Sequence, residues 1–153
     1  MSIEAKLAEL KLELPPVPKP GGNYKPVVQV GNIIYVSGHG PLQTDKTLIT
    51  GKVGSDLTQE EGYQAARVTG LAMLATIKNH LGSLDRLKRT VKVLGMVNAT
   101  PDFQTHPAVI NGFSDLLAEL LGENGVGARS AVGMGSLPGN ISVEVEAIFE
   151  IEE

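Results

Sequence analysis

The sequence predicts an α+β domain in which two main helices cover one face of a mixed β-sheet. Strand-like runs stand at both ends of the chain, and two segments of helical period lie between them, separated by one more strand-like run. A length of 153 residues suits one domain with its own core. The second sheet face is only partly polar, since Val132, Met134 and Ile148 stand among glycines and acids. We therefore expect a symmetric oligomer.

The N-terminal segment predicts a short amphipathic helix that leads into an extended arm. Apolar residues recur at helical spacing at Ile3, Leu7, Leu10 and Leu14. Pro15-Pro16 ends this pattern, and a proline-rich stretch continues to Pro20. We assign residues 1–21 to this helix and arm, and residues 22–153 to the main domain. The pattern leaves open whether the helix covers a cleft or packs on a neighbouring subunit.

The next segment predicts a β-hairpin. Residues 26–30 and 33–37 are rich in β-branched side chains, and Gly31-Asn32 between them supplies the backbone freedom that a two-residue turn requires.

A long helix should follow, because Thr58-Gln-Glu-Glu61 has the spacing of a capping box and Gly82 suits a left-handed C-terminal cap. Its apolar stripe comprises Tyr63, Ala66, Gly70, Leu74, Ile77 and Leu81. Residues 88–97 read as a strand. Pro107 then suits the first turn of a second helix that ends at Gly122. Its predicted inner face comprises Ile110, Phe113, Leu117 and Leu120.

Two further strands are expected at the C-terminal end. Arg129 heads a strand of small residues, and residues 142–151 alternate so that Glu144 and Glu146 share a face. If residues 137–140 join the two strands as a hairpin, a carboxylate faces the pocket that the arginine guards. The alternative is a solvated strand face on an antiparallel sheet.

Composition restricts the possible chemistry. The chain has no cysteine, which excludes thiol nucleophiles and thiolate metal sites, and its histidines show no ligand spacing, so we expect no metal. A net charge of −4 with interspersed signs argues against a nucleic-acid partner. The charged N-terminus and the lack of a long apolar run predict neither a signal peptide nor a membrane partner. We expect a soluble, cytoplasmic protein.

A set of short motifs runs in a fixed order through residues 22–150. It comprises Tyr24, Gly31-Asn32, Ile34-Tyr-Val-Ser-Gly-His-Gly-Pro-Leu42, Asn111, Ala128-Arg-Ser130, Leu137-Pro138 and Val143-Glu-Val-Glu-Ala-Ile148. With these motifs the chain resembles the RidA (YjgF/YER057c/UK114) family, also known by the older name endoribonuclease L-PSP. The resemblance implies a chorismate-mutase-like (bacillus type) fold and a barrel-like homotrimer with small-molecule sites in the clefts between subunits.

The resemblance also implies an activity. Archetypal members hydrolyse reactive enamines and imines, such as 2-aminoacrylate and its tautomer, to a 2-keto acid and ammonia without a cofactor. In this chain Arg129 would hold the substrate carboxylate, and Glu144 would position or activate a water. Tyr24, Gly38 and Asn111 fall on residues of the same pocket.

Three positions depart from the archetypes. Ala131 replaces a cysteine, Gly127 replaces a proline, and His39 replaces a glutamine. The lost cysteine is not needed for imine hydrolysis and indicates a changed pocket polarity, with backbone groups beside Ala131 available to the reacting atoms. His39 would form part of the pocket wall or carry a proton. The chain therefore resembles a divergent subgroup.

Deamination of a small enamine or imine acid is the function that these residues favour. The alternative is a non-catalytic trimer that binds or senses a carboxylate metabolite. Ribonuclease activity, implied only by the older name, is disfavoured by the acidic charge balance. The sequence does not distinguish a simple 2-imino acid from an aminomuconate-type enamine as substrate.

Overall fold

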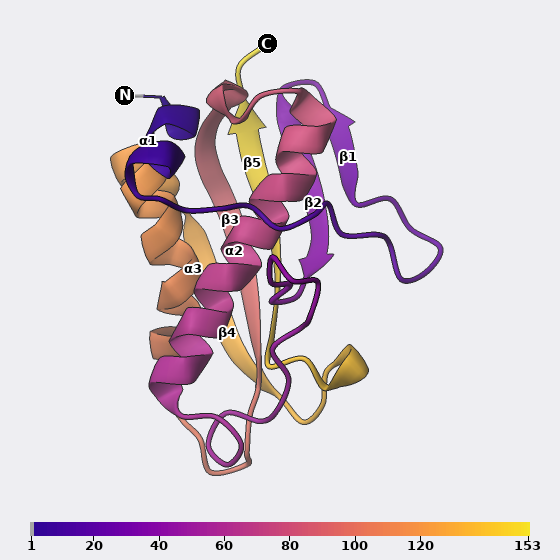
Figure 1. Ribbon diagram of the computed structural model, residues 1–153, viewed down its shortest axis with the longest axis vertical. Coiled ribbons are helices and arrows are strands. Elements are labelled where there is room, and N and C mark those ends of the chain that lie inside the picture. Colours follow the sequence, from indigo (N-terminus) through magenta and orange to yellow (C-terminus); the bar gives the residue numbers. More distant parts are fainter. Residues whose placement is uncertain (1) are drawn as a thin grey trace.

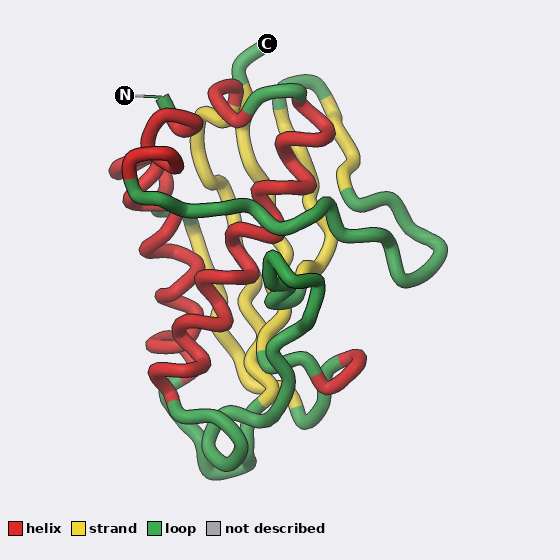
Figure 2. The backbone as a smooth tube through the Cα atoms, in the orientation of Figure 1, coloured by secondary structure: helices red, strands yellow, loops and turns green. Residues whose placement is uncertain are grey.

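A computed structural model describes residues 2–153 as a five-stranded mixed sheet with helices on one face (Figure 1). The elements are α1 (Ile3–Glu9), β1 (Val27–Val30), β2 (Ile33–His39), α2 (Gln59–Leu81), β3 (Leu87–Asn98), α3 (His106–Leu121), β4 (Ala128–Met134) and β5 (Val143–Ile151). Figure 2 shows α2 and α3 lying over the same side of the sheet. The predicted α+β class, with two main helices on one face, is confirmed.

The N-terminal hairpin forms as predicted. β1 and β2 pair antiparallel, with Val30 opposite Ile33 across a two-residue turn. Gly31 has a φ of 62°, which a glycine adopts at low cost and which the first position of a type II′ turn requires.

The two long helices begin and end where the sequence indicates. Thr58 caps α2 through a complete capping box with Glu61, and Gly82 follows the helix in the left-handed conformation. Pro107 lies in the first turn of α3, and Gly122 follows its last residue. Within residues 2–153, no helix combines the length and the apolar character that crossing a membrane requires.

The first helix is shorter than predicted, because α1 ends at Glu9 and Leu10 is exposed. Lys11 has a φ of 56°. The amide of Leu12 donates to the carbonyl of Leu7, and the amide of Lys11 donates to that of Ala8. This is a Schellman arrangement with a lysine at the left-handed position, where a glycine would have been the sequence signal. Ile3 and Leu7 nevertheless belong to the main core.

The two long helices pack closely because glycines lie at their contact. A β-carbon on Gly112 would lie 2.9 Å from the carbonyl carbon of Tyr63 and 3.1 Å from the amide nitrogen of Arg67. A β-carbon on Gly70 would lie 2.7 Å from Leu116 Cδ2. The atoms near Gly112 are backbone, so only glycine at that position allows this separation of α2 and α3, whereas at Gly70 the end of the Leu116 side chain would have to shift.

The C-terminal strands do not form the hairpin considered from the sequence, so that prediction is wrong. The strand order is β1-β2-β5-β3-β4, and β3 lies between β4 and β5. α3 carries the chain from β3 to β4, so these two strands are parallel. β5 then pairs antiparallel with both β3 and β2. β4 is therefore an edge strand.

The sheet has one face buried under the helices and one open face. The predicted alternation in β5 is confirmed, since its inner residues are all buried: Val143, Val145, Ala147, Phe149 and Ile151. On the open face, Val28 is 46%, Val30 62%, Tyr35 47% and Val132 38% exposed. An exposed surface with this many apolar side chains is typical of a protein–protein contact.

Candidate functional site

Arg129 lies on the edge strand β4 and extends toward α3. It pairs with Val93, a buried residue of β3, which places its side chain on the helix-covered face. Its Nη1 donates to Oδ1 of Asn111 at 2.8 Å and to Oγ of Ser114 at 3.2 Å. Among residues 2–153, Nε and Nη2 of Arg129 have no hydrogen-bond partner, and no carboxylate forms an ion pair with the guanidinium. The guanidinium thus keeps donors available for an anion.

Ser114 was missed from the sequence, although a signal for it existed. It follows Asn111 by three residues on α3, and residues at this spacing share a helix face. Asn111 and Ser114 are both neutral acceptors, so they orient the guanidinium without cancelling its charge.

Ala131 lies two residues after Arg129 on the same strand face. It pairs with Gly95 of β3 and packs against the hydrophobic core. Its methyl group adds no polar atom to this face. As β4 is the sheet edge, the outward backbone groups of this strand are not paired in the sheet.

Glu144 lies on the open face of the sheet, in a groove of about 540 Å³ that it lines with Tyr24, Ser37, Gly38 and Glu146. Partial burial, and secondarily repulsion from Glu146, raise the pKa of the Glu144 carboxyl. A carboxylate with a raised pKa is a stronger base than an unperturbed one, which suits it to accept and return a proton.

Gly38 allows the Glu144 carboxylate to occupy this position. A β-carbon on Gly38 would lie 3.0 Å from Cδ and 3.2 Å from Cγ of Glu144, and closer still to Oε2. The register between β2 and β5 shifts at this point, from Val36 opposite Ala147 to His39 opposite Val145. Ser37 and Gly38 therefore form a β-bulge, a feature that is frequent beside functional sites.

Tyr24 borders the same groove from the loop before β1. Its hydroxyl accepts a hydrogen bond from the amide of Gly21 at 3.1 Å, and the side chain is 48% exposed. Ser37 Oγ donates to the carbonyl of Lys25 at 2.6 Å and ties this loop to the bulge. The ring of Tyr24 is thus held at the groove with a large accessible surface.

His39 is buried, and both of its ring nitrogens are engaged by the protein. Nδ1 lies 2.6 Å from the carbonyl of Ser37, and Nε2 lies 2.7 Å from Oγ1 of Thr76 on α2. A carbonyl only accepts, so Nδ1 donates, and Nε2 of the neutral ring accepts from the threonine hydroxyl. Burial lowers the pKa of His39 and favours this neutral form. In this arrangement the ring joins the bulge to α2.

Arg129 and Glu144 do not meet within one chain. Arg129 lies beside Val93 and Val93 lies beside Ala147, three residues from Glu144 on β5. Because successive side chains alternate, an odd number of residues places the two charged groups on opposite faces of the sheet. The hypothesis that the carboxylate faces the arginine's own pocket is therefore wrong for a single copy.

The candidate site consists of two half-sites. We call Arg129, Asn111 and Ser114 the arginine half-site, and Glu144, Gly38 and Tyr24 the glutamate half-site. Across residues 2–153, no group of three or more histidine, aspartate or glutamate side chains is arranged to hold a metal ion.

Comparison with known proteins supports the fold and the family. The family model described as "YjgF/chorismate_mutase-like, putative endoribonuclease" matches residues 4–150. "Protein TCP17" of Trypanosoma cruzi is 39% identical over 97% of this chain and 94% of its own. A "2-iminobutanoate/2-iminopropanoate deaminase" of Dermatophagoides farinae is 32% identical over 92% of this chain and 95% of its own.

A solved structure matches nearly the whole chain. The crystal structure of a "putative endoribonuclease" from Shewanella oneidensis superposes with a TM-score of 0.94 at 34% identity, covering 99% of this chain and 100% of that one. Together these matches confirm the chorismate-mutase-like fold that the resemblance implies.

Proposed function

The chain belongs to the YjgF/chorismate-mutase-like family, and we propose that it hydrolyses small 2-imino acids and their enamine tautomers to 2-keto acids and ammonia. The name of the Dermatophagoides farinae relative, which is a 2-iminobutanoate/2-iminopropanoate deaminase, supports this reaction class. The observation that carries the proposal is the pair of half-sites, one with an unpaired guanidinium and one with a carboxyl group of raised pKa.

In this proposal the active unit is a homotrimer, in which the arginine half-site of one copy meets the glutamate half-site of the next. Two features support such an assembly. Arg129 lies on an edge strand, and Glu144 lies on a sheet face that also exposes Val30, Tyr35 and Val132. A second copy packed on this face buries the apolar side chains and places the guanidinium and the carboxyl group on opposite sides of one substrate site.

Arg129 binds the substrate. A 2-imino acid carries a carboxylate next to the electrophilic carbon of its C=N bond, and the planar guanidinium matches a carboxylate with two parallel hydrogen bonds. Asn111 and Ser114 fix the orientation of the guanidinium, so the imine carbon is held at a defined position. Since the imine hydrolyses slowly in water without help, orientation supplies much of the acceleration.

Glu144 moves the protons. Its carboxylate takes a proton from water as the water oxygen bonds to the carbon of the protonated imine, C=NH2+, which gives a neutral tetrahedral carbinolamine. The protonated Glu144 then donates to the nitrogen. As the C–N bond breaks and ammonia leaves, the carbinolamine hydroxyl returns its proton to the Glu144 carboxylate and the C=O bond forms. An enamine enters the same sequence when the protonated Glu144 donates to its β-carbon, which gives C=NH2+. Each step conserves atoms and electrons without a cofactor.

Replacement of Arg129 tests the binding step. Arg129→Ala should lower kcat/KM for freshly generated 2-aminoacrylate by about 30- to 5,000-fold, as truncation of one partner in a buried charge pair does. Arg129→Lys keeps the charge but loses the planar fork of donors. Its kcat/KM should lie between those of the wild type and of Arg129→Ala. Undiminished ammonia release by Arg129→Ala would remove the arginine from the mechanism.

Mixing of variants tests the shared site. Arg129→Ala and Glu144→Gln should each have strongly reduced activity alone. If the two proteins are unfolded together and refolded at equal concentrations, about a quarter of the sites should combine an intact arginine half-site with an intact glutamate half-site. Activity should therefore return to about a quarter of the wild-type value. No recovery in mixed trimers, verified by mass, would place each site within one copy and contradict the proposal.

A non-catalytic trimer that binds a carboxylate metabolite is the alternative outcome. Calorimetric binding of 2-ketobutyrate by the wild-type protein, combined with no acceleration of imine hydrolysis, would select it.

A further inference from the structure

A second pocket opens beside Gly38, and its walls are mostly apolar. We call it the proline pocket and define it by Pro18, Pro20, Leu42, Leu48 and Ile141, which line a volume of about 300 Å³. Two of these residues come from the N-terminal arm, and two come from the loop after β2. None of them belongs to the half-sites described above.

The proline pocket is continuous with the groove of Glu144. Tyr24, Gly38, Gly40, Pro138 and Ile141 line both. A molecule whose reacting carbon lies over the Glu144 carboxylate can therefore extend a substituent past Gly38 and Gly40 into the proline pocket. At these two positions the space of a β-carbon is taken by the Glu144 carboxylate and by the Ile141 side chain, which border the passage.

The chemistry of the walls favours an apolar substituent. Pyrrolidine rings and aliphatic side chains offer no hydrogen bonds, and transfer of an apolar group from water into such surroundings is favourable. His39 also borders the pocket, but both ring nitrogens are bonded to Ser37 and Thr76. Lys19 is the one charged side chain along the lining among residues 2–153, and it is exposed.

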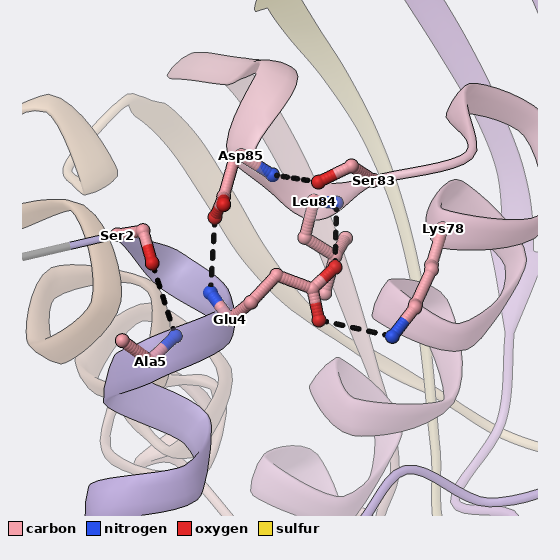
Figure 3. A network of polar contacts seen from close by, with 7 residues as sticks. All are labelled: Ser2, Glu4, Ala5, Lys78, Ser83, Leu84 and Asp85. Carbon is pink, nitrogen blue, oxygen red and sulfur yellow. Dashed lines mark hydrogen bonds and ion pairs between the residues drawn. The ribbon is translucent and has the colours of Figure 1, made fainter.

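The arm that forms one wall is anchored at its start. Glu4 accepts from Lys78 Nζ at 2.9 Å and from the amide of Leu84 at 3.0 Å, while Asp85 accepts from the amide of Glu4 at 3.0 Å (Figure 3). In the view of Figure 1 the following arm passes across α2 toward β1 and β2.

Packing fixes the rest of the arm. Leu12 and Leu14 pack against the core, and Pro15 is buried. Proline restricts the backbone further. The wall is thus formed before a ligand arrives, which removes an ordering cost from binding.

We propose that the proline pocket receives the side chain of the substrate and selects 2-imino acids with a branched or long aliphatic side chain over those with a methyl group. This inference rests on the proposed function and specifies its substrate class. It also gives the N-terminal arm a role in substrate selection.

Competition between two substrates tests the selection. The imines of leucine and of alanine are generated in situ with an L-amino-acid oxidase, and formation of each 2-keto acid is measured above the uncatalysed rate. The wild-type protein should have a kcat/KM about 10- to 100-fold higher for the leucine-derived imine, because added methylene groups in an apolar pocket discriminate by this order.

Two arm and loop variants test whether the pocket is responsible. Leu48→Trp fills the pocket from its 45% exposed rim and should lower the leucine-to-alanine ratio of kcat/KM at least tenfold. Val17→Trp adds the same side chain at a 46% exposed arm position outside the lining and should leave the ratio unchanged.

The outcomes separate the inference from the proposed function. Equal kcat/KM for both imines, or an unchanged ratio in Leu48→Trp, would overturn the inference and leave imine hydrolysis standing. A preference for the glutamate-derived imine that disappears in Lys19→Ala would also overturn it, since the pocket would then select a second carboxylate. Failure to accelerate hydrolysis of any imine would contradict the proposed function and the inference together.

Discussion

Substitution of Gly38 by alanine tests whether the position of the Glu144 carboxylate controls the reaction. The added β-carbon would lie 3.0 Å from Cδ and 3.2 Å from Cγ of Glu144. Carbon atoms make ordinary contact at about 3.5–4.0 Å and Oε2 lies closer still than these two carbons, so the carboxyl group must move by about 1 Å. A displacement of this size at a catalytic group costs about 100-fold in rate, and we expect kcat/KM to fall by that factor.

The fold should survive the change, because the obstructing atoms belong to the end of a flexible side chain and Gly38 does not have a positive φ. Gly135→Ala is the matched control, since a β-carbon there meets nothing within 4 Å. The two variants should have similar melting temperatures, and only Gly38→Ala should lose activity in the 2-aminoacrylate assay.

A double variant decides whether the loss acts through the carboxylate. If Gly38→Ala works by displacing Glu144, adding it to Glu144→Gln should reduce kcat/KM no further. Full activity in Gly38→Ala, or independent losses in the double variant, would refute the reasoning.

Three further substitutions, with Thr105→Ala as a control for one of them, test the electrostatics and the packing. Glu144→Gln should raise the free energy of unfolding at pH 7, because the raised pKa means that the folded state disfavours the carboxylate. Chemical denaturation should show that this gain in stability disappears as the pH falls through the pKa of Glu144. The kcat/KM of the wild-type protein should decline over the same pH range, because the carboxylate that acts as the base becomes protonated. Thr58→Ala should cost about 1 kcal/mol of unfolding free energy through loss of the capping box. Thr105→Ala should cost less, since Thr105 makes no side-chain cap bond. Gly112→Ala should lower stability by about 3 kcal/mol or more by forcing α2 and α3 apart, and a melting temperature within 2–4 °C of the wild type, roughly a 1 kcal/mol change, would contradict this account.

Local features of the fold could be predicted from the sequence because their causes lie within a few residues. Thr58 and Glu61 cap the same turn that they mark, and Gly31 supplies the positive φ of the turn in which it stands. Lys11 shows where prediction from local sequence fails. It takes a left-handed conformation that glycine usually marks, so neighbouring residues gave no sign that α1 would end at Glu9.

Strand order depends on contacts that are distant in sequence, and here local patterns failed. The turn residues between β4 and β5 suit a hairpin, but α3 places β4 parallel to β3 and leaves β5 to pair on the other side. Arg129, Asn111 and Glu144 could be named from a resemblance to a family. The placement of Arg129 and Glu144 on opposite faces of the sheet could not be predicted in this way, because it depends on how β4 and β5 are each aligned with β3.

The separation of the two charged residues has a physical consequence. If Arg129 and Glu144 were neighbours in one chain, the guanidinium would form an ion pair with the carboxylate and lower its pKa, and neither group would be available to a substrate. In this chain the guanidinium is held by the neutral side chains of Asn111 and Ser114, and burial and Glu146 raise the pKa of the Glu144 carboxyl. Each of the two charged groups stabilises the folded single chain less than it would in an ion pair. Residues that are retained at a cost in stability are often functional. In the proposed trimer the substrate carboxylate pairs with Arg129 on binding, which leaves the Glu144 carboxylate free to take a proton from the water that attacks the imine.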